Sequence, residues 1–215
     1  ASLTQYTTTG LLNSDAVSSV TLSSAGSAAT AAVGTYAITA ASATGTGLGN
    51  YTITYTNGTL TVNPVALSIT ASNASKTYGS IASLTQYTTS GLLNSDAVSG
   101  VTLSSIGSSA LAAVGTYTIT AASATGTGLG NYIITYTNGT LTVNPAALTI
   151  TASNASKTYG TTASLTQYNA SGLLNSDAVS GVTLSSTGSP TTANVGTYNI
   201  VPSGATGTGL GNYTI

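Results

Sequence analysis

The chain repeats its own sequence with a period of 81 residues. The segment Ala-Ser-Leu-Thr-Gln-Tyr begins at Ala1 and returns at Ala82 and at Ala163. Residues 1–66 and 82–147 differ at only eight positions. A fixed period of this length indicates an array in which one structural unit is copied along the chain. Arrays of near-identical copies are typical of fibres, stalks and multivalent surface proteins, and enzymes seldom need them.

The period predicts three domains. Residues 1–64 are a partial repeat lacking its first strand, 65–145 a complete repeat, and 146–215 a partial repeat lacking its final strand. Because the chain starts and stops inside a copy, we interpret it as a window on a longer array. The copies are joined through Asn63-Pro64 and its later equivalent, and proline restricts both its own backbone and that of the preceding residue. We therefore expect short, stiff junctions and a rod-like arrangement.

Charged residues are almost absent. Lys and Arg together number 2, Asp and Glu together number 3, and there is no His and no Cys. Nucleic-acid binding requires clustered Lys and Arg, so this partner is excluded. A calcium site needs several carboxylates, and a serine without a neighbouring base is not a nucleophile. The composition therefore predicts no catalytic, cofactor-binding or metal-binding residues, and no enzyme activity.

Alternating patterns predict β-strands. Tyr51 to Thr56 alternates Tyr and Ile with Thr, and Thr59 to Val62 continues the alternation after Asn57-Gly58. Asn-Gly between two alternating runs is a strong hairpin signal. A two-residue loop would place Tyr55 opposite Leu60 on one face, so the sequence predicts a hairpin here and around Asn138-Gly139.

The other segments also favour strands over helices. Apolar residues alternate with Thr or Ser in three further segments: 67–71, 101–103 and 117–119. Residues 83–90 read as a strand with a bulge, because Leu84 and Tyr87 differ in parity. Residues 91–98 lack alternation and are read as a loop or a short helical turn. The predicted fold is all-β, made of small antiparallel domains.

One set of motifs resembles a known family. The segment from Leu67 to Ser80 contains Lys76-Thr-Tyr-Gly79, Val114-Gly-Thr-Tyr follows in the second half, and the unit closes at Asn144-Pro145. Their order resembles the MBG domain of the YGX type, a tandem module of large bacterial surface proteins and filamentous-haemagglutinin-like adhesins. The resemblance implies a β-rich fold, β-grasp-like in its arrangement, and a role in a stalk or adhesive array.

Three features suggest chemistry, each with a plainer alternative. Lys76 with Asp96, and Lys157 with Asp177, are either solubilising charges or surface ion pairs, or belong to a lysine–asparagine isopeptide site. The recurring tyrosines are either core residues, which the phase of Tyr36, Tyr51 and Tyr55 with Ile and Leu favours, or a sugar-stacking surface whose exposed members are Tyr6 and its equivalents. The run Gly45-Thr-Gly-Leu-Gly49 is a turn, because no lysine or helix follows it as a phosphate loop requires.

Two functions fit these observations. The first is a structural array that forms an extracellular stalk or fibre of a bacterial surface adhesin or exoprotein. The second is a multivalent module that binds carbohydrate or matrix, with avidity from the repeats. The expected partners are neighbouring repeats in the same chain, other copies of the chain in a filament, and a glycan ligand. No segment approaches the roughly 20 apolar residues that span a membrane.

Overall fold

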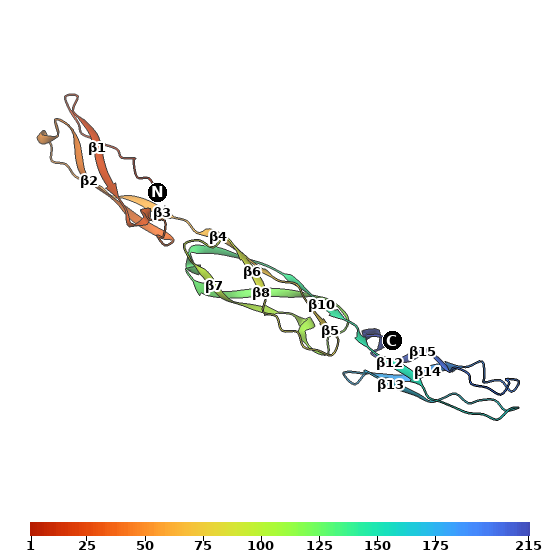
Figure 1. Ribbon diagram of the computed structural model, residues 1–215. Helices are drawn as coiled ribbons and strands as arrows, with labels where there is room; N and C mark the ends of the chain where they lie inside the picture. Colours follow the sequence, from red (N-terminus) through yellow and green to blue (C-terminus); the bar gives the residue numbers. More distant parts are fainter. The chain divides into compact units, whose positions relative to one another are not determined.

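The computed structural model describes all 215 residues as two compact units. Unit 1 comprises Ala1–Ile69, Thr88–Thr102 and Ala122–Tyr136, and unit 2 comprises the remaining residues. The division runs through the middle repeat, so each unit contains parts of two successive repeats. Figure 1 shows the elements of both units.

The chain is all-β, as the sequence predicts, and its only helical elements are five three-residue 3-10 turns. None of these turns is long or apolar enough to cross a membrane. The strands are β1 (Ala16–Ser23), β2 (Gly34–Thr46), β3 (Gly58–Val62), β4 (Val65–Ala71), β5 (Ala74–Thr77), β6 (Tyr87–Ser90), β7 (Ala97–Ser104), β8 (Gly115–Thr127), β9 (Tyr132–Thr137), β10 (Gly139–Asn144), β11 (Ala146–Ala147), β12 (Thr149–Ala152), β13 (Tyr168–Ser171), β14 (Ala178–Ser185), β15 (Val201–Thr208) and β16 (Tyr213–Thr214). The 3-10 turns are η1 (Ala25–Ser27), η2 (Leu48–Asn50), η3 (Ile106–Ser108), η4 (Leu129–Asn131) and η5 (Leu210–Asn212).

The strands of the middle repeat form two sheets. One sheet has the order β5-β10-β8-β7 and the other has the order β6-β4-β9. In the first sheet β10 runs parallel to β5 and antiparallel to β8. The first repeat has the sheet β1-β2-β3, and the third repeat has the two-stranded sheets β11-β16, β12-β13 and β14-β15.

Alternation places one side of each core strand inside the protein. Leu67 and Ile69 of β4 are fully buried, as are Leu141 and Val143 of β10 and Ile119 of β8. The intervening Thr and Ser side chains are more accessible. The strands predicted over 67–71, 101–103 and 117–119 therefore lie in β4, β7 and β8 as expected.

The predicted Asn-Gly hairpin is wrong. Strands β9 and β10 flank Asn138, but they belong to different sheets and do not pair with each other. Leu60 lies opposite Tyr36 of β2 instead of Tyr55. Gly139 is required for a different reason, because a Cβ atom there would lie 2.6 Å from the carbonyl oxygen of Ala71. The chain thus passes from one sheet to the other at this glycine.

Some predicted strands differ in extent. Residues 51–56 of the first repeat form no strand, although the equivalent residues 132–137 of the middle repeat form β9. In the middle repeat β9 pairs with β4. The strand predicted over 83–90 is restricted to β6. Residues 91–96 form a loop with a tight turn at Asn94 and Ser95, which both have positive φ.

The entry and exit segments of the repeats run side by side in one direction. In unit 2, β5 pairs with β10 in parallel, with Ala74 opposite Leu141 and Thr77 opposite Asn144. Also in unit 2, β11 pairs with β16 in parallel, with Ala146 opposite Tyr213. In both ladders the partners are 67 residues apart in the sequence.

Candidate functional site at the junction between repeats

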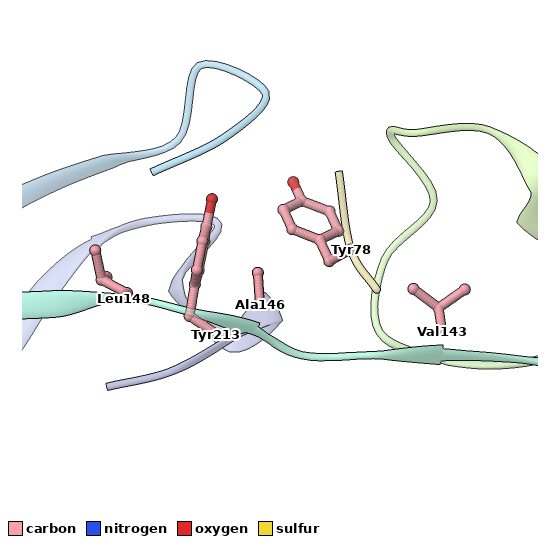
Figure 2. Packing of buried hydrophobic residues seen from close by; sticks show 5 residues of the cluster. All are labelled: Tyr78, Val143, Ala146, Leu148 and Tyr213. Carbon is pink, nitrogen blue, oxygen red and sulfur yellow. The ribbon is translucent and has the colours of Figure 1, made fainter. Parts of the chain in front are cut away.

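A buried cluster lies where the middle repeat meets the third repeat in unit 2. Its members are Tyr78, Val143, Ala146, Leu148 and Tyr213, all less than one tenth exposed. Tyr78 directly follows β5, and Tyr213 opens β16. Figure 2 shows the two tyrosine side chains on either side of Ala146, with both hydroxyl groups on the same side. The apolar surface of this cluster therefore belongs to both repeats.

One carboxylate connects the two tyrosines. The Tyr78 hydroxyl donates to Asp177 Oδ2 at 2.8 Å, and the Tyr213 hydroxyl donates to the same oxygen at 2.8 Å. The rings meet edge to face, with centroids 5.6 Å apart. This arrangement is favourable for aromatic pairs. Burial, followed by the hydrogen bond to Asp177, raises the pKa of Tyr213 above its ordinary value. Hydrogen bonds to an ionised carboxylate are stronger than neutral ones, so the bond from Tyr78 to Asp177 joins the middle repeat firmly to the third.

Two asparagines add hydrogen bonds across the same junction. The backbone N–H of Val114 donates to Asn212 Oδ1 at 2.9 Å. Asn175 Nδ2 donates to the carbonyl oxygen of Ala110 at 2.9 Å. In both pairs the side chain comes from the third repeat and the backbone group from the middle repeat. These bonds satisfy loop backbone groups that an open junction would leave to water.

The same contacts recur in unit 1, between the first and middle repeats. The N–H of Val33 donates to Asn131 Oδ1 at 2.9 Å, and Asn94 Nδ2 donates to Ala29 O at 3.1 Å. The sequence separations, 98 and 65 residues, are identical to those in unit 2. Asp96 again accepts a hydrogen bond from Tyr132, at 2.8 Å. The junction is therefore a repeated structural feature.

Glycines allow the close approach of the repeats. Gly79 has φ 85°, a left-handed conformation that other residues seldom adopt. A Cβ atom there would lie 2.5 Å from Leu174 Cδ1 of the third repeat. Gly209 has φ 73°, and a Cβ atom there would overlap the carboxylate of Asp177. The Tyr-Gly pair thus supplies both the tyrosine and the space that the junction needs.

Tyr78 also braces the link between the repeats. Its backbone N–H donates to the carbonyl oxygen of Asn144 at 2.8 Å, immediately before Pro145. On the far side of the proline, the N–H of Leu148 donates to Thr214 O at 2.9 Å. The linker is therefore tied to a neighbouring strand on each side. This agrees with the expectation of a short, restrained junction.

The lysines and the aspartates bond to other groups and not to each other, so the ion-pair alternative is not the one that the structure shows. In the third repeat, Lys157 Nζ donates to the carbonyl oxygens of Thr161, at 3.0 Å, and Pro190, whereas Asp177 bonds the two tyrosines. Lys76 Nζ likewise donates to Ser80 O, at 2.9 Å, and to Ser109 O. Lys76 is buried, and desolvation lowers its pKa. The lysine therefore holds two loops together, and this geometry gives no support to an isopeptide bond with Asp177 as the acid.

Other candidate sites from the sequence are structural. Tyr6 is exposed, at 38%, whereas its equivalents Tyr87 and Tyr168 are half-buried. The glycine run 45–49 covers the end of β2 and the turn η2, as the turn interpretation predicts. A groove of about 650 Å³ in the third repeat is lined on two sides by residues 155–157 and 196–200. In the middle repeat the matching segments flank β10.

Sequence reasoning did not identify the junction residues. Asp177 looks like an isolated solubilising charge, and Asn212 and Asn175 lie in segments without alternation. A usable signal was present, because Tyr-Gly, Asn-Ser-Asp and Leu-Gly-Asn-Tyr return unchanged in non-alternating segments. Side chains that recur outside the core pattern fit contacts between copies.

The three copies and their junctions define a tandem array of small all-β domains. The chain belongs to the family described as MBG domain (YGX type), whose model matches residues 2–61, 67–142 and 148–215. The resemblance found in the sequence is thus confirmed, and Tyr78-Gly79-Ser80 corresponds to the Tyr-Gly-X of the family's description. No curated protein and no solved structure shows significant similarity to the chain.

Proposed function

We propose that the chain acts as a structural repeat array in an extracellular stalk or fibre of a bacterial surface protein. The observation that carries this proposal is the junction, in which the same side chains make the same hydrogen bonds at equal sequence separations in both units. A linker that only tethered independent binding modules would need no such contacts. Ordered junctions are what a stalk requires, because they resist bending between domains.

The surface chemistry supports the same role. The two lysines and three aspartates leave few charged groups for recognising a ligand. Each of these five side chains forms a hydrogen bond with another group of the protein. The exposed faces of the strands are rich in Thr and Ser, which suit a solvated β-surface. Neighbouring repeats are therefore the partners that the geometry favours most.

The order of the junction can be measured by spin labelling. The chain contains no cysteine, so labels attach only at introduced ones. Thr118→Cys in the middle repeat and Thr183→Cys in the third repeat are both exposed and lie outside the junction. Pulsed electron–electron double resonance should give one narrow distribution of the distance between the two labels in the double variant. Asp177→Asn or Asn212→Ala in the same background should broaden it. A broad distribution in the unaltered junction would overturn the proposal.

Association between chains is tested separately by electron microscopy of the purified protein. A nearly neutral chain with exposed strand edges lacks the charge repulsion that opposes edge-to-edge pairing. Ordered filaments would identify a fibre made of several chains, and isolated particles would identify a single-chain stalk. Either result is compatible with the junction's role, and it decides between the two forms of the proposal.

A further inference from the structure

We propose that the parallel ladder between the entry and exit segments of a repeat is a mechanical clamp that is loaded in shear when the chain is pulled. The entry segment is residues 65–77 (β4 and β5), and the exit segment is residues 132–144 (β9 and β10). The relevance of the clamp to the organism depends on the proposed stalk function. The clamp itself is a property of one repeat.

The first step is the direction of the strands. The chain enters the middle repeat at the start of β4 and leaves it at the end of β10. In unit 2, β5 and β10 run parallel over four consecutive residue pairs. β4 lies beside β9 in the other sheet, and the counterparts of these two strands in the third repeat, β11 and β16, are parallel. In unit 2, β5 of the entry segment is therefore bonded directly to β10 of the exit segment, and the two strands run the same way.

Tension on the chain acts along a parallel pair of strands. Tension pulls the start of the entry segment and the end of the exit segment in opposite directions. Because the strands are parallel, these two points are at opposite ends of the ladder. The force acts along the strands, so the hydrogen bonds between them are strained together. In an antiparallel pair pulled from its shared end, the bonds break one after another under a smaller force.

The third step is the resistance to sliding. Leu141 and Val143 of β10 are fully buried, and the alternating threonines are on the other face. A slip of one residue would exchange these faces and place threonine in the core. The N–H of Thr140 also donates to Asn73 Oδ1 at 2.8 Å, at the break between β4 and β5. Both the side chains and this hydrogen bond therefore oppose the movement that tension favours.

The fourth step is the connection to the next repeat. Tyr78 follows β5 without a gap, bonds the backbone of Asn144 at the end of β10, and donates its hydroxyl to Asp177. The end of the clamp is thus bonded to the next repeat in addition to the covalent link through Pro145. Tension arriving at the junction is shared between the linker and the strand β5.

The test compares two pulling directions in the same protein by single-molecule force spectroscopy. Val65→Cys with Asn144→Cys loads the ladder in shear, since these residues stand at the start of β4 and the end of β10. Thr116→Cys with Asn144→Cys pulls β8 and β10 apart from their shared end, because Thr116 is the register partner of Thr142. Thr116 and Asn144 are polar and Val65 is apolar, and all three residues are exposed. Chemical denaturation should give equal stabilities for the two double variants.

We expect the shear pair to unfold at a force at least twofold higher than the peeling pair at the same loading rate. The shear event is recognised by its length, because it releases about 80 residues of roughly 3.3–3.6 Å each. Asn73→Ala should lower the shear force more than the peeling force. Asn154→Ala, at the same position of the third repeat, should change neither. Equal forces in the two directions would overturn the clamp.

The experiments test the clamp proposal and the stalk proposal independently. A broad spin-label distribution with a high shear force would remove the stalk and keep the clamp. A narrow distribution with equal forces would keep the stalk and remove the clamp.

Discussion

The hydroxyl of Tyr78 lies 2.8 Å from Asp177 Oδ2, although 99 residues separate the two in the sequence. Tyr78 belongs to the middle repeat and Asp177 to the third, and a second tyrosine of the third repeat donates to the same oxygen. The Tyr-Gly motif is therefore a contact between repeats. Within its own repeat, Tyr78 bonds Asn144 and the N–H of Gly79 donates to Ala110 O at 3.2 Å.

Removing this hydroxyl should weaken the junction. We expect Tyr78→Phe to lower the free energy of unfolding by about 1.5–3 kcal/mol, the usual range for a hydrogen bond to a charged group. Urea denaturation measures the change, and a double-mutant cycle with Asp177→Asn isolates the pair. Tyr159→Phe is the matched control, because Tyr159 occupies the same position of the third repeat and is 65% exposed. An equal loss in the two variants would contradict the assignment.

The glycine after this tyrosine should matter through its backbone and through its neighbour. Gly79 and Gly160 both have φ 85°, so alanine at either position costs roughly 1–2 kcal/mol of left-handed strain. Only Gly79 has a residue of the next repeat, Leu174, in the path of a new Cβ atom. Gly79→Ala should therefore destabilise the chain more than Gly160→Ala in the same denaturation experiment. The reverse order would exclude the contact with Leu174.

The Asn-Gly positions distinguish a sheet crossing from a hairpin. Gly139→Ala should be strongly destabilising, because the new Cβ atom would lie 2.6 Å from Ala71 O and 2.8 Å from Ser72 O. Gly58→Ala should be mild, because its nearest neighbour is Ile38 Cβ at 3.6 Å. Thermal melting of the two variants makes the comparison. If both glycines were in hairpin turns, the two substitutions would cost similar amounts.

The leucine of the exit strand should contribute more to the free energy of unfolding in the middle repeat than in the first repeat. Leu141 is fully buried and belongs to β10, the strand between β5 and β8. We expect Leu141→Ala to lower the free energy of unfolding by about 2–5 kcal/mol. Leu60 lies in the identical segment of the first repeat but is only half-buried. Leu60→Ala should cost clearly less when both are measured by equilibrium unfolding. Similar values would mean that the first repeat has a complete core in solution.

Stability should fall in alkaline solution. The pKa of Tyr213 is raised above its ordinary value of 10.0 by burial and then by Asp177, so the folded chain holds this proton more tightly than the unfolded chain. The corresponding stabilisation is complete below pH 10 and is lost as the pH rises through the raised pKa. Melting temperatures recorded across this range should therefore fall less steeply for Tyr213→Phe.

The lowered pKa of Lys76 acts in the opposite sense. Its stabilising effect is present above the ordinary lysine pKa of 10.5 and is lost as the pH falls through the lowered value. Because Tyr213→Phe leaves Lys76 in place, this contribution is common to both proteins and cancels in their difference. Identical alkaline slopes would show that Tyr213 does not titrate differently in the folded chain.

The local pattern of the sequence was sufficient to predict the strands but not their partners. Alternation identified the segments at Leu67, Val101 and Tyr117, because each has one buried face. It could not show that the strands on either side of Asn138 pair with segments about 67 residues earlier in the chain. The Asn-Gly signal describes turns between adjacent partners, and here tertiary pairing decides the outcome. The Asn-Gly pair does mark a position that requires glycine, and the physical reason is the close backbone of Ala71.

The junction was hidden for a similar reason. A single aspartate in a polar loop gives no sign that two tyrosines converge on it, one of them 99 residues away. Within one period the motif Asn175-Ser-Asp177 reads as a turn, which it also is, because Asn175 and Ser176 have positive φ. Only the placement of two copies side by side shows that the same residues also bond the preceding repeat.

The fixed spacing of the junction contacts has a consequence for how such a gene can change. The middle copy presents Tyr78-Gly79 to the copy after it, and that copy presents Asp177, Asn175 and Asn212 in return. A duplication or deletion of one whole 81-residue period creates a boundary with the same partners as every other boundary. A change of any other length separates Tyr78 from its carboxylate. Recombination between copies can therefore lengthen or shorten the molecule in whole steps without requiring a new interface.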